Sequence, residues 1–306
     1  MRILITGSNG MLGSDLVEAF SEKYEIFGLG KHPNRHPKLQ YHQADLAHSA
    51  QIKKAVSEIK PAVIVHAAAY TDVDGCELNP HQAFLINTIG TQSIAEASDQ
   101  TGATLIFLSS DYVFNGKKSG PYLETDSPDP ISVYGRSKFE AEEWLKNHSK
   151  SVSIIRTSWL FGKNGRNFFR AILNLLSEGK DLNVVNDQLG APTYTLDLAE
   201  GIKMFIERAK RPKGHVTYHL ANTGSTTWHG AALKLIELTK EKKQVKAITT
   251  DQLNRPAKRP ANSVLNLEQI KNTYQISLRS WEDALNHYWK QALSEEWQRK
   301  IRKQHA

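Results

Sequence analysis

The feature that most constrains the fold is a glycine-rich turn at the start of the chain. Gly7, Gly10 and Gly13 follow a short apolar run over residues 1–6 and precede apolar positions at helical spacing over residues 12–20. In a strand–turn–helix unit of this kind, the first glycine permits the sharp turn, the second lets the backbone approach a pyrophosphate, and the third allows close helix–strand packing. The helix N-terminus adds free N–H groups and a positive dipole end. The turn therefore predicts a dinucleotide site.

Strands and helices continue to alternate through the first half of the chain. Short apolar runs predict strands at residues 24–29, 62–68, 104–109 and 152–156. Apolar residues at helical spacing predict helices at residues 52–59 and 84–98. Strands that alternate with helices pair in parallel through right-handed crossovers. The predicted fold class is α/β, with a doubly wound parallel sheet of Rossmann type.

The alternation loosens in the second half of the chain. The expected elements there are helices at 168–176 and 197–208, a loop at 187–195, and no regular structure at 251–262, which contains Pro256 and Pro260. We therefore expect a dinucleotide-binding domain over residues 1–160. Residues 161–306 are expected to form mainly a smaller substrate-binding lobe, interwoven with the first domain.

Charge, hydropathy and cysteine content narrow the class of protein. The 306 residues include 39 Lys and Arg against 32 Asp and Glu, a net charge of +7, but the basic residues form no stripe interleaved with aromatic ones. Nucleic-acid binding is therefore not expected. No apolar run approaches the roughly 20 residues that span a bilayer, and no secretory signal is recognisable. The single cysteine, Cys76, excludes an internal disulfide framework. These features predict a cytoplasmic protein that binds a small anionic ligand.

The end of the second strand bears on the choice of cofactor. An acidic residue there would bind the 2′-hydroxyl of the adenosine ribose and favour NAD. This chain has Lys31 and His32 instead, with Arg35 close behind. Cationic side chains at this place can pair with a 2′-phosphate. The sequence therefore predicts NADPH, with NADH as the alternative.

Tyr134 and Lys138 are four residues apart, so on a helix they share one face. An isolated tyrosine has a pKa of about 10 and exchanges protons poorly at neutral pH. A neighbouring ammonium, together with the positive nicotinamide of an oxidised cofactor, stabilises the phenolate and lowers that pKa, so we expect Lys138 to act on Tyr134 in this way. Lys138 can also bind the ribose of a nicotinamide.

Two further strand ends carry residues suited to this chemistry. Ser110 follows the strand at 104–109, and its hydroxyl can hold a substrate carbonyl for hydride attack. Ala67, Ala68 and Ala69 follow the strand at 62–68 and are small enough to let a ribose lie against the backbone. Ligands of open α/β sheets bind at such carboxyl ends of strands.

With these motifs the chain resembles the extended short-chain dehydrogenase/reductase family and, within it, the dTDP-4-dehydrorhamnose reductases. The resemblance extends over residues 1 to about 285. The matching runs are Gly7 to Gly13, Ala67 to Thr71, Ser109 to Gly116, Tyr134 to Lys138, Arg156 to Trp159, Asn167-Phe168, Asp187 to Thr193, Tyr218 to Asn222 and Arg259 to Ser263.

The resemblance implies roles for individual residues. Tyr134 would donate a proton to O4 of a 4-keto sugar, Lys138 would be its partner and a ribose ligand, and Ser110 would complete the catalytic set, although the family more often has threonine there. The cofactor contacts implied, together with those deduced above, are Gly7, Gly10, Met11, Leu12, Gly13, Lys31, Asp45, Leu46, Ala67, Ala68, Ala69 and Lys138. The implied contacts of the nucleotide sugar are Ser110, Asp111, Tyr112 and Trp159.

The implied reaction reduces the C4 keto group of dTDP-4-dehydro-6-deoxy-L-mannose to dTDP-L-rhamnose, a precursor of cell-surface polysaccharide. A homodimer is compatible with the resemblance. Some members of the family use magnesium, but the sequence shows no carboxylate cluster that predicts a metal site.

Two alternatives stay open at this point. The first keeps the fold but changes the reaction to a nucleotide-sugar 4,6-dehydration or C4 epimerisation. Two features speak against it. The dehydratases have a glutamate where this chain has Tyr112, and the epimerases usually have an acidic residue after the second strand, which this chain lacks. The second alternative is an interaction protein that resembles the regulatory β subunit of methionine adenosyltransferase. The presence of both Tyr134 and Lys138 favours an enzyme.

Overall fold

In the computed structural model, which describes residues 1–34, 36–37 and 39–304, one parallel sheet organises the chain. Across the described residues its order is β11-β6-β5-β4-β1-β2-β3. The strands are β1 (Arg2–Thr6), β2 (Glu25–Gly30), β3 (Gln40–Gln43), β4 (Val63–His66), β5 (Thr104–Ser110), β6 (Ser151–Thr157) and β11 (Gly214–His219). The strand order reverses between β1 and β4, which confirms the predicted doubly wound Rossmann-type fold.

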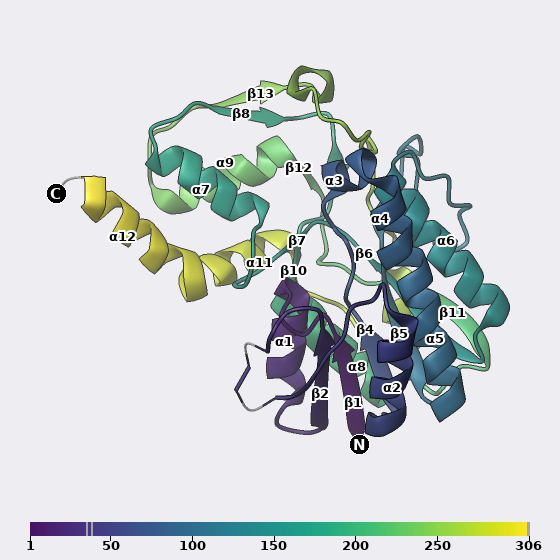
Figure 1. The fold of residues 1–306 in the computed structure, drawn as a ribbon. Helices are drawn as coiled ribbons and strands as arrows, with labels where there is room; N and C mark the ends of the chain where they lie inside the picture. The colour runs from purple at the N-terminus through teal and green to yellow at the C-terminus, as the bar shows by residue number, and fades with distance from the viewer. Residues whose placement is uncertain (35, 38, 305–306) are drawn as a thin grey trace.

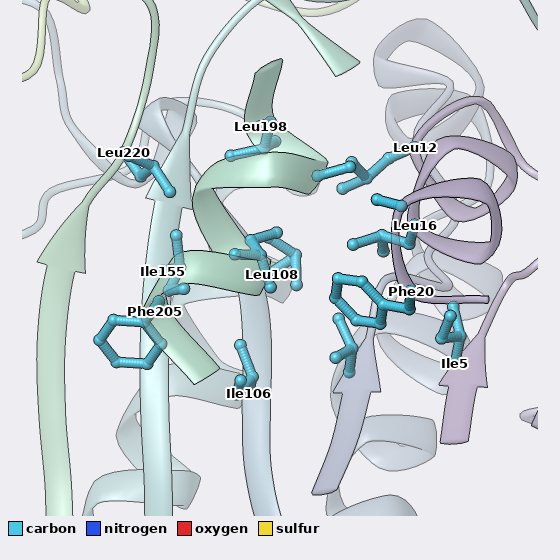
Figure 2. Packing of buried hydrophobic residues seen from close by; sticks show 14 of the residues in the cluster. Ile5, Leu12, Leu16, Phe20, Ile106, Leu108, Ile155, Leu198, Phe205 and Leu220 are labelled. Carbon is cyan, nitrogen blue, oxygen red and sulfur yellow. The ribbon is translucent and has the colours of Figure 1, made fainter. Parts of the chain in front are cut away.

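Helices cover both faces of the sheet (Figure 1). One face carries α1 (Met11–Phe20), α8 (Thr195–Arg208) and α10 (Glu268–Tyr274). The other carries α2 (Ser49–Ile59), α5 (Gly90–Thr101) and α6 (Val133–His148). The strands are apolar on both sides because each side packs against helices. Figure 2 shows this core from close by: Leu198 lies toward Leu12 of α1, and Phe205 and Leu220, also from the second half of the chain, lie beside Ile155 of β6.

The C-terminal lobe has a hydrophobic core of its own beyond the carboxyl ends of the strands. Its helices are α7 (Phe168–Ser177), α9 (Trp228–Thr239), α11 (Trp281–Tyr288) and α12 (Ser294–Gln304), with a π-helical turn at Trp289–Leu293. Its strands form the pairs β8 (Leu182–Val185) with β13 (Val245–Ile248), β9 (Leu189–Gly190) with β12 (Thr226–Thr227), and β7 (Leu160–Phe161) with β10 (Thr193–Tyr194). None of the described helices has the length and apolar character of a bilayer-spanning segment.

Most of the expected elements are present, but three segments differ from the prediction. The helix expected at 84–98 is composed of α4 (Pro80–Phe84), a π-helical turn (Leu85–Ile89) and α5. The expected loop at 187–195 contains the two-residue strands β9 and β10 and runs into α8. The segment expected to be irregular begins inside a 3-10 helix, Thr250–Leu253, because its prolines come later and leave this turn free to form.

Two further short elements connect the strands to the helices. They are α3 (Val73–Leu78) and a 3-10 turn, Asp111–Val113, directly after β5. Both lie next to the carboxyl edge of the sheet, where the candidate site is found.

Candidate active site

A cavity of about 930 Å³ lies at the carboxyl ends of the strands, where the strand order reverses. It is lined by the β1–α1 turn, by the ends of β2, β4, β5 and β6, by the first turn of α6 and by residues of the C-terminal lobe. This is the place where open α/β sheets bind their ligands. All the predicted cofactor, catalytic and substrate residues line this one cavity.

The glycine turn is packed so closely that side chains would not fit. Gly7 has a φ of +69°, and a Cβ there would lie 2.9 Å from Cα of Ala68. A Cβ on Gly13 would lie 2.0 Å from the carbonyl oxygen of Gly7. Gly10 is exposed at the mouth of the turn, and its backbone N–H donates to the Gly7 carbonyl oxygen at 2.8 Å. The turn thus offers bare backbone and the N-terminus of α1 to the cavity, which suits a pyrophosphate.

Lys31, which follows β2, and Asp45, which follows β3, face each other at one end of the cavity, and Tyr134 lies toward the other end. The Lys31 ammonium lies 3.0 Å from a carboxylate oxygen of Asp45. Burial raises the pKa of Asp45, but a hydrogen bond from the Ala47 N–H and the ion pair with Lys31 outweigh it and lower the pKa overall. The positive charge of Lys31 on the cavity rim is thus already paired with the carboxylate of Asp45. Arg35, the third cation of the prediction, is outside the described residues.

A buried hydrogen-bond chain fixes the alanine segment beside the glycine turn. The Ala68 N–H donates to the Thr6 hydroxyl at 3.1 Å, and the same hydroxyl lies 2.6 Å from Nδ1 of His66. Burial lowers the pKa of His66 to about 3, so the ring is neutral. Nε2 of His66 bonds the Thr91 hydroxyl at 3.0 Å, and Thr91 donates onward to the Asn87 carbonyl. Because the Thr91 hydroxyl donates its own proton to Asn87, it must accept from His66, and this hydrogen-bond network therefore places the imidazole proton on Nε2.

Ser110 and Asp111 lie at the end of β5 and interact with each other. The Ser110 hydroxyl donates to a carboxylate oxygen of Asp111 at 3.0 Å and accepts from the Tyr112 N–H at 3.2 Å. Asp111 is almost completely buried, and this burial raises its pKa to about 7. An ordinary carboxyl group is fully ionised at neutral pH, whereas Asp111 takes up its proton near it.

The start of α6 carries the predicted pair. Ser132 caps the helix by accepting from the Gly135 N–H at 3.2 Å, and Tyr134 and Lys138 follow one turn apart. The buried Lys138 ammonium donates to the Leu108 carbonyl at 2.8 Å and lies 4.0 Å from the centre of the Phe107 ring. Burial lowers the pKa of Lys138 to about 7, although Glu142 raises it in opposition.

The expected effect of Lys138 on Tyr134 is not what the structure shows. Burial raises the pKa of Tyr134 above its ordinary value, a hydrogen bond with Ser110 lowers it in opposition, and Asp111 raises it further. The expectation differs because it took Lys138 as a full positive charge close to the phenol. In the structure that ammonium is bound to the Leu108 carbonyl and its own pKa is lowered.

The RmlD substrate-binding-domain family matches residues 1–294 of the chain. The chain is 36% identical over 288 residues to the spore coat polysaccharide biosynthesis protein SpsK of Bacillus subtilis, covering 94% of this chain and 96% of that protein. It is 36% identical over 291 residues to the dTDP-4-dehydrorhamnose reductase of Sinorhizobium fredii, covering 93% and 95%.

Among solved structures, the dTDP-4-dehydrorhamnose reductase of Bacillus anthracis in complex with NADP has a TM-score of 0.86 and 35% identity, covering 95% of this chain and 99% of that one. The chain belongs to the RmlD family. This confirms the resemblance, and the chain is a nucleotide-sugar reductase of this family. The NADP bound by the Bacillus anthracis relative is the class of cofactor that the residues after the second strand predict for this chain.

In this member of the RmlD family, sequence reasoning missed several residues in or beside the site, among them Asn87, Arg166 and Trp228. Asn87, in the π-helical turn, donates to the Ser137 hydroxyl and to the Tyr70 carbonyl, both at 3.0 Å, and accepts from the Tyr70 N–H. It therefore ties α6 to the segment after β4. Arg166 and Trp228 line the cavity from the lobe. No spacing pattern in the sequence singles out any of the three, because each comes from a segment whose course only the tertiary structure fixes.

Proposed function

We propose that this chain reduces the C4 keto group of dTDP-4-dehydro-6-deoxy-L-mannose to dTDP-L-rhamnose, with NADPH as the hydride source and Tyr134 as the proton donor. The observation that carries the proposal is the gathering of Tyr134, Lys138 and Ser110 in one cavity with the glycine turn. The reductases among the relatives, and the NADP in one of them, support it.

The cavity fits the proposed cofactor. The packed glycine turn gives room and backbone N–H groups for a pyrophosphate, and Ala67 to Ala69 leave space for a ribose. Lys31 would bind the 2′-phosphate, for which it would have to share its charge with Asp45 or exchange that partner. Lys138 would bind the nicotinamide ribose. NADPH, when bound, supplies the hydride that adds to C4 of the sugar.

The protein side of the reaction is the delivery of a proton to O4. Tyr134 holds its proton at neutral pH and can donate it, although burial raises its pKa and so makes the phenol a weaker acid than an exposed tyrosine. Ser110 can hold the keto oxygen next to the Tyr134 phenol, since its hydroxyl is oriented by Asp111 and by the Tyr112 N–H. The Lys138 ammonium, which donates to the Leu108 carbonyl, would have to turn from that partner to stabilise the negative charge left on Tyr134 after transfer. Asp111, Tyr112 and Trp159 would bind the sugar nucleotide.

The test is an assay of the purified chain with NADPH and a panel of 4-keto-6-deoxy sugar nucleotides that differ in sugar configuration and base. We expect the fastest loss of NADPH absorbance with dTDP-4-dehydro-6-deoxy-L-mannose, and slower loss with NADH. Faster turnover of another sugar or base would replace the proposed substrate. No consumption with any of them, together with stable binding to a methionine adenosyltransferase, would favour the regulatory alternative.

A further inference from the structure

Two tryptophans from different parts of the fold stack on each other in the cavity. Trp159 follows β6 of the main sheet, and Trp228 is the first residue of α9 in the lobe. Their ring centres are 3.6 Å apart and their planes differ by 4°. Phe168 extends the group, with its ring centre 4.6 Å from that of Trp228. Both indoles line the same cavity as Tyr134 and Ser110.

The backbone of Trp159 is held in a conformation that a large residue rarely adopts. Its φ is +45°, in the left-handed region that costs free energy for a residue with a Cβ. Hydrogen bonds hold this conformation from both sides: Ser158 donates to the Ala191 carbonyl at 2.8 Å, and the Thr193 N–H donates to the Trp159 carbonyl at 3.1 Å. Strain kept by surrounding structure in this way is concentrated at functional sites.

The lobe is shaped to receive the Trp159 indole. A Cβ on Gly190 would lie 2.3 Å from Cε2 of Trp159, so the ring uses the space left by the missing side chain. Gly190 pairs with Thr226 in the β9–β12 ribbon, and Trp228 follows directly after that ribbon. The short ribbon therefore places both the slot for Trp159 and the ring that stacks on it.

We propose that Trp228 is a positioning residue for the sugar: by stacking on Trp159, it fixes the indole that forms the apolar wall of the sugar-binding part of the cavity. A 6-deoxyhexose has a methyl group and C–H faces that pack on such a wall. Holding the sugar in one orientation places C4 for hydride addition. This inference rests on the proposed function.

The test compares ligands with and without the sugar. Binding of dTDP and of dTDP-L-rhamnose is measured calorimetrically in saturating NADP⁺ for the wild type, Trp228→Ala and Trp228→Phe. We expect Trp228→Ala to lose about tenfold in affinity for dTDP-L-rhamnose and to bind dTDP within about twofold of the wild type. Trp228→Phe, which keeps a ring for Trp159, should recover most of the loss. In turnover, Trp228→Ala should raise KM and also lower kcat, because a loosely oriented sugar reacts more slowly.

Trp144→Ala is the matched control. Trp144 stacks on His148 at 4.7 Å on α6, away from the described residues that line the cavity. The Trp144→Ala variant should bind both dTDP and dTDP-L-rhamnose within about twofold of the wild-type affinities. An equal loss of affinity for dTDP and for dTDP-L-rhamnose in Trp228→Ala would show that the stack is purely structural, and would overturn the inference. The inference would also be overturned if Trp228→Ala were active and bound dTDP-L-rhamnose with unchanged affinity. A wild type that neither binds dTDP-L-rhamnose nor consumes NADPH would refute the proposed function, and the inference with it.

Discussion

At the scale of single residues, burial is the largest influence on the pKa values of Tyr134, Asp111 and Lys138. Tyr134 is the residue on which the proposed proton transfer depends, and burial raises its pKa, so that the phenol is protonated at neutral pH and a weaker acid than an exposed tyrosine. Tyr134→Phe removes the donor but leaves the ring. We expect kcat for NADPH oxidation to fall by about 10²–10⁴, with the Kd for NADPH within about twofold of the wild type.

The control for Tyr134→Phe is Tyr274→Phe, which removes a hydroxyl that bonds Tyr218 at 3.3 Å, and neither tyrosine is among the described residues that line the cavity. It should keep the wild-type kcat. Activity of Tyr134→Phe near that of the wild type would mean that another group supplies the proton.

Asp111 makes a second prediction at this scale, on stability. Burial raises its pKa from 3.8 to about 7, so the folded state binds this proton more tightly than the unfolded state. The resulting stabilisation is complete below pH 3.8 and is lost as the pH rises to about 7. Asp111→Asn has no such loss. Its free energy of unfolding should therefore increase relative to the wild type across this window, by a few kcal/mol as an order of magnitude.

Urea denaturation of both proteins at several pH values between 4 and 8 measures this difference. Other buried groups such as His66 titrate equally in the two proteins and cancel. A difference that is independent of pH would contradict the assigned pKa.

At the scale of elements, the β1–α1 turn combines packing and binding in one structure. A Cβ on Gly13 would lie 2.0 Å from the Gly7 carbonyl oxygen, and backbone cannot yield as a flexible side chain does. Gly13→Ala must therefore displace the turn. We expect the Kd for NADPH to rise by at least about tenfold, measured by the change in NADPH fluorescence on binding.

Gly120→Ala provides the comparison, since a Cβ there meets nothing within 4 Å among the described residues. It should bind NADPH as the wild type does. If Gly13→Ala also bound NADPH normally, the turn would not be the pyrophosphate site.

The elements differ in how far the sequence determines them. Three glycines between an apolar run and a helical pattern predict the β1–α1 turn, because the physical reasons are local. The four-residue spacing likewise predicts that Tyr134 and Lys138 share a helix face. The π-helical turn around Asn87 and the place of β11 depend on contacts with distant segments, which leave no periodic signal. The stack of Trp159 on Trp228 joins residues far apart in sequence, so neither residue indicates it alone.

At the scale of the whole molecule, the second half of the chain completes the first. Strand β11 pairs with β6 along its length, and α8 packs on α1. The buried Arg156 binds Glu142 of α6 through a contact of 2.6 Å and faces His219 of β11 at 3.4 Å. The sheet therefore continues past the boundary expected near residue 160, and the two parts share one core, as Figure 2 illustrates.

The last prediction follows from this shared core. A fragment of residues 1–160 lacks Leu198, Ile202, Phe205, Tyr218 and Leu220, which are all buried against the retained sheet and helices. Burial of each such side chain contributes about 1.5–3 kcal/mol, and a whole domain is stable by only about 5–15 kcal/mol. We expect the fragment to show no cooperative thermal transition by circular dichroism and no NADPH binding, and co-expression with residues 161–306 to restore both. Cooperative unfolding of the isolated fragment, with the NADPH affinity of the full chain, would instead show an autonomous domain whose core needs nothing from the lobe.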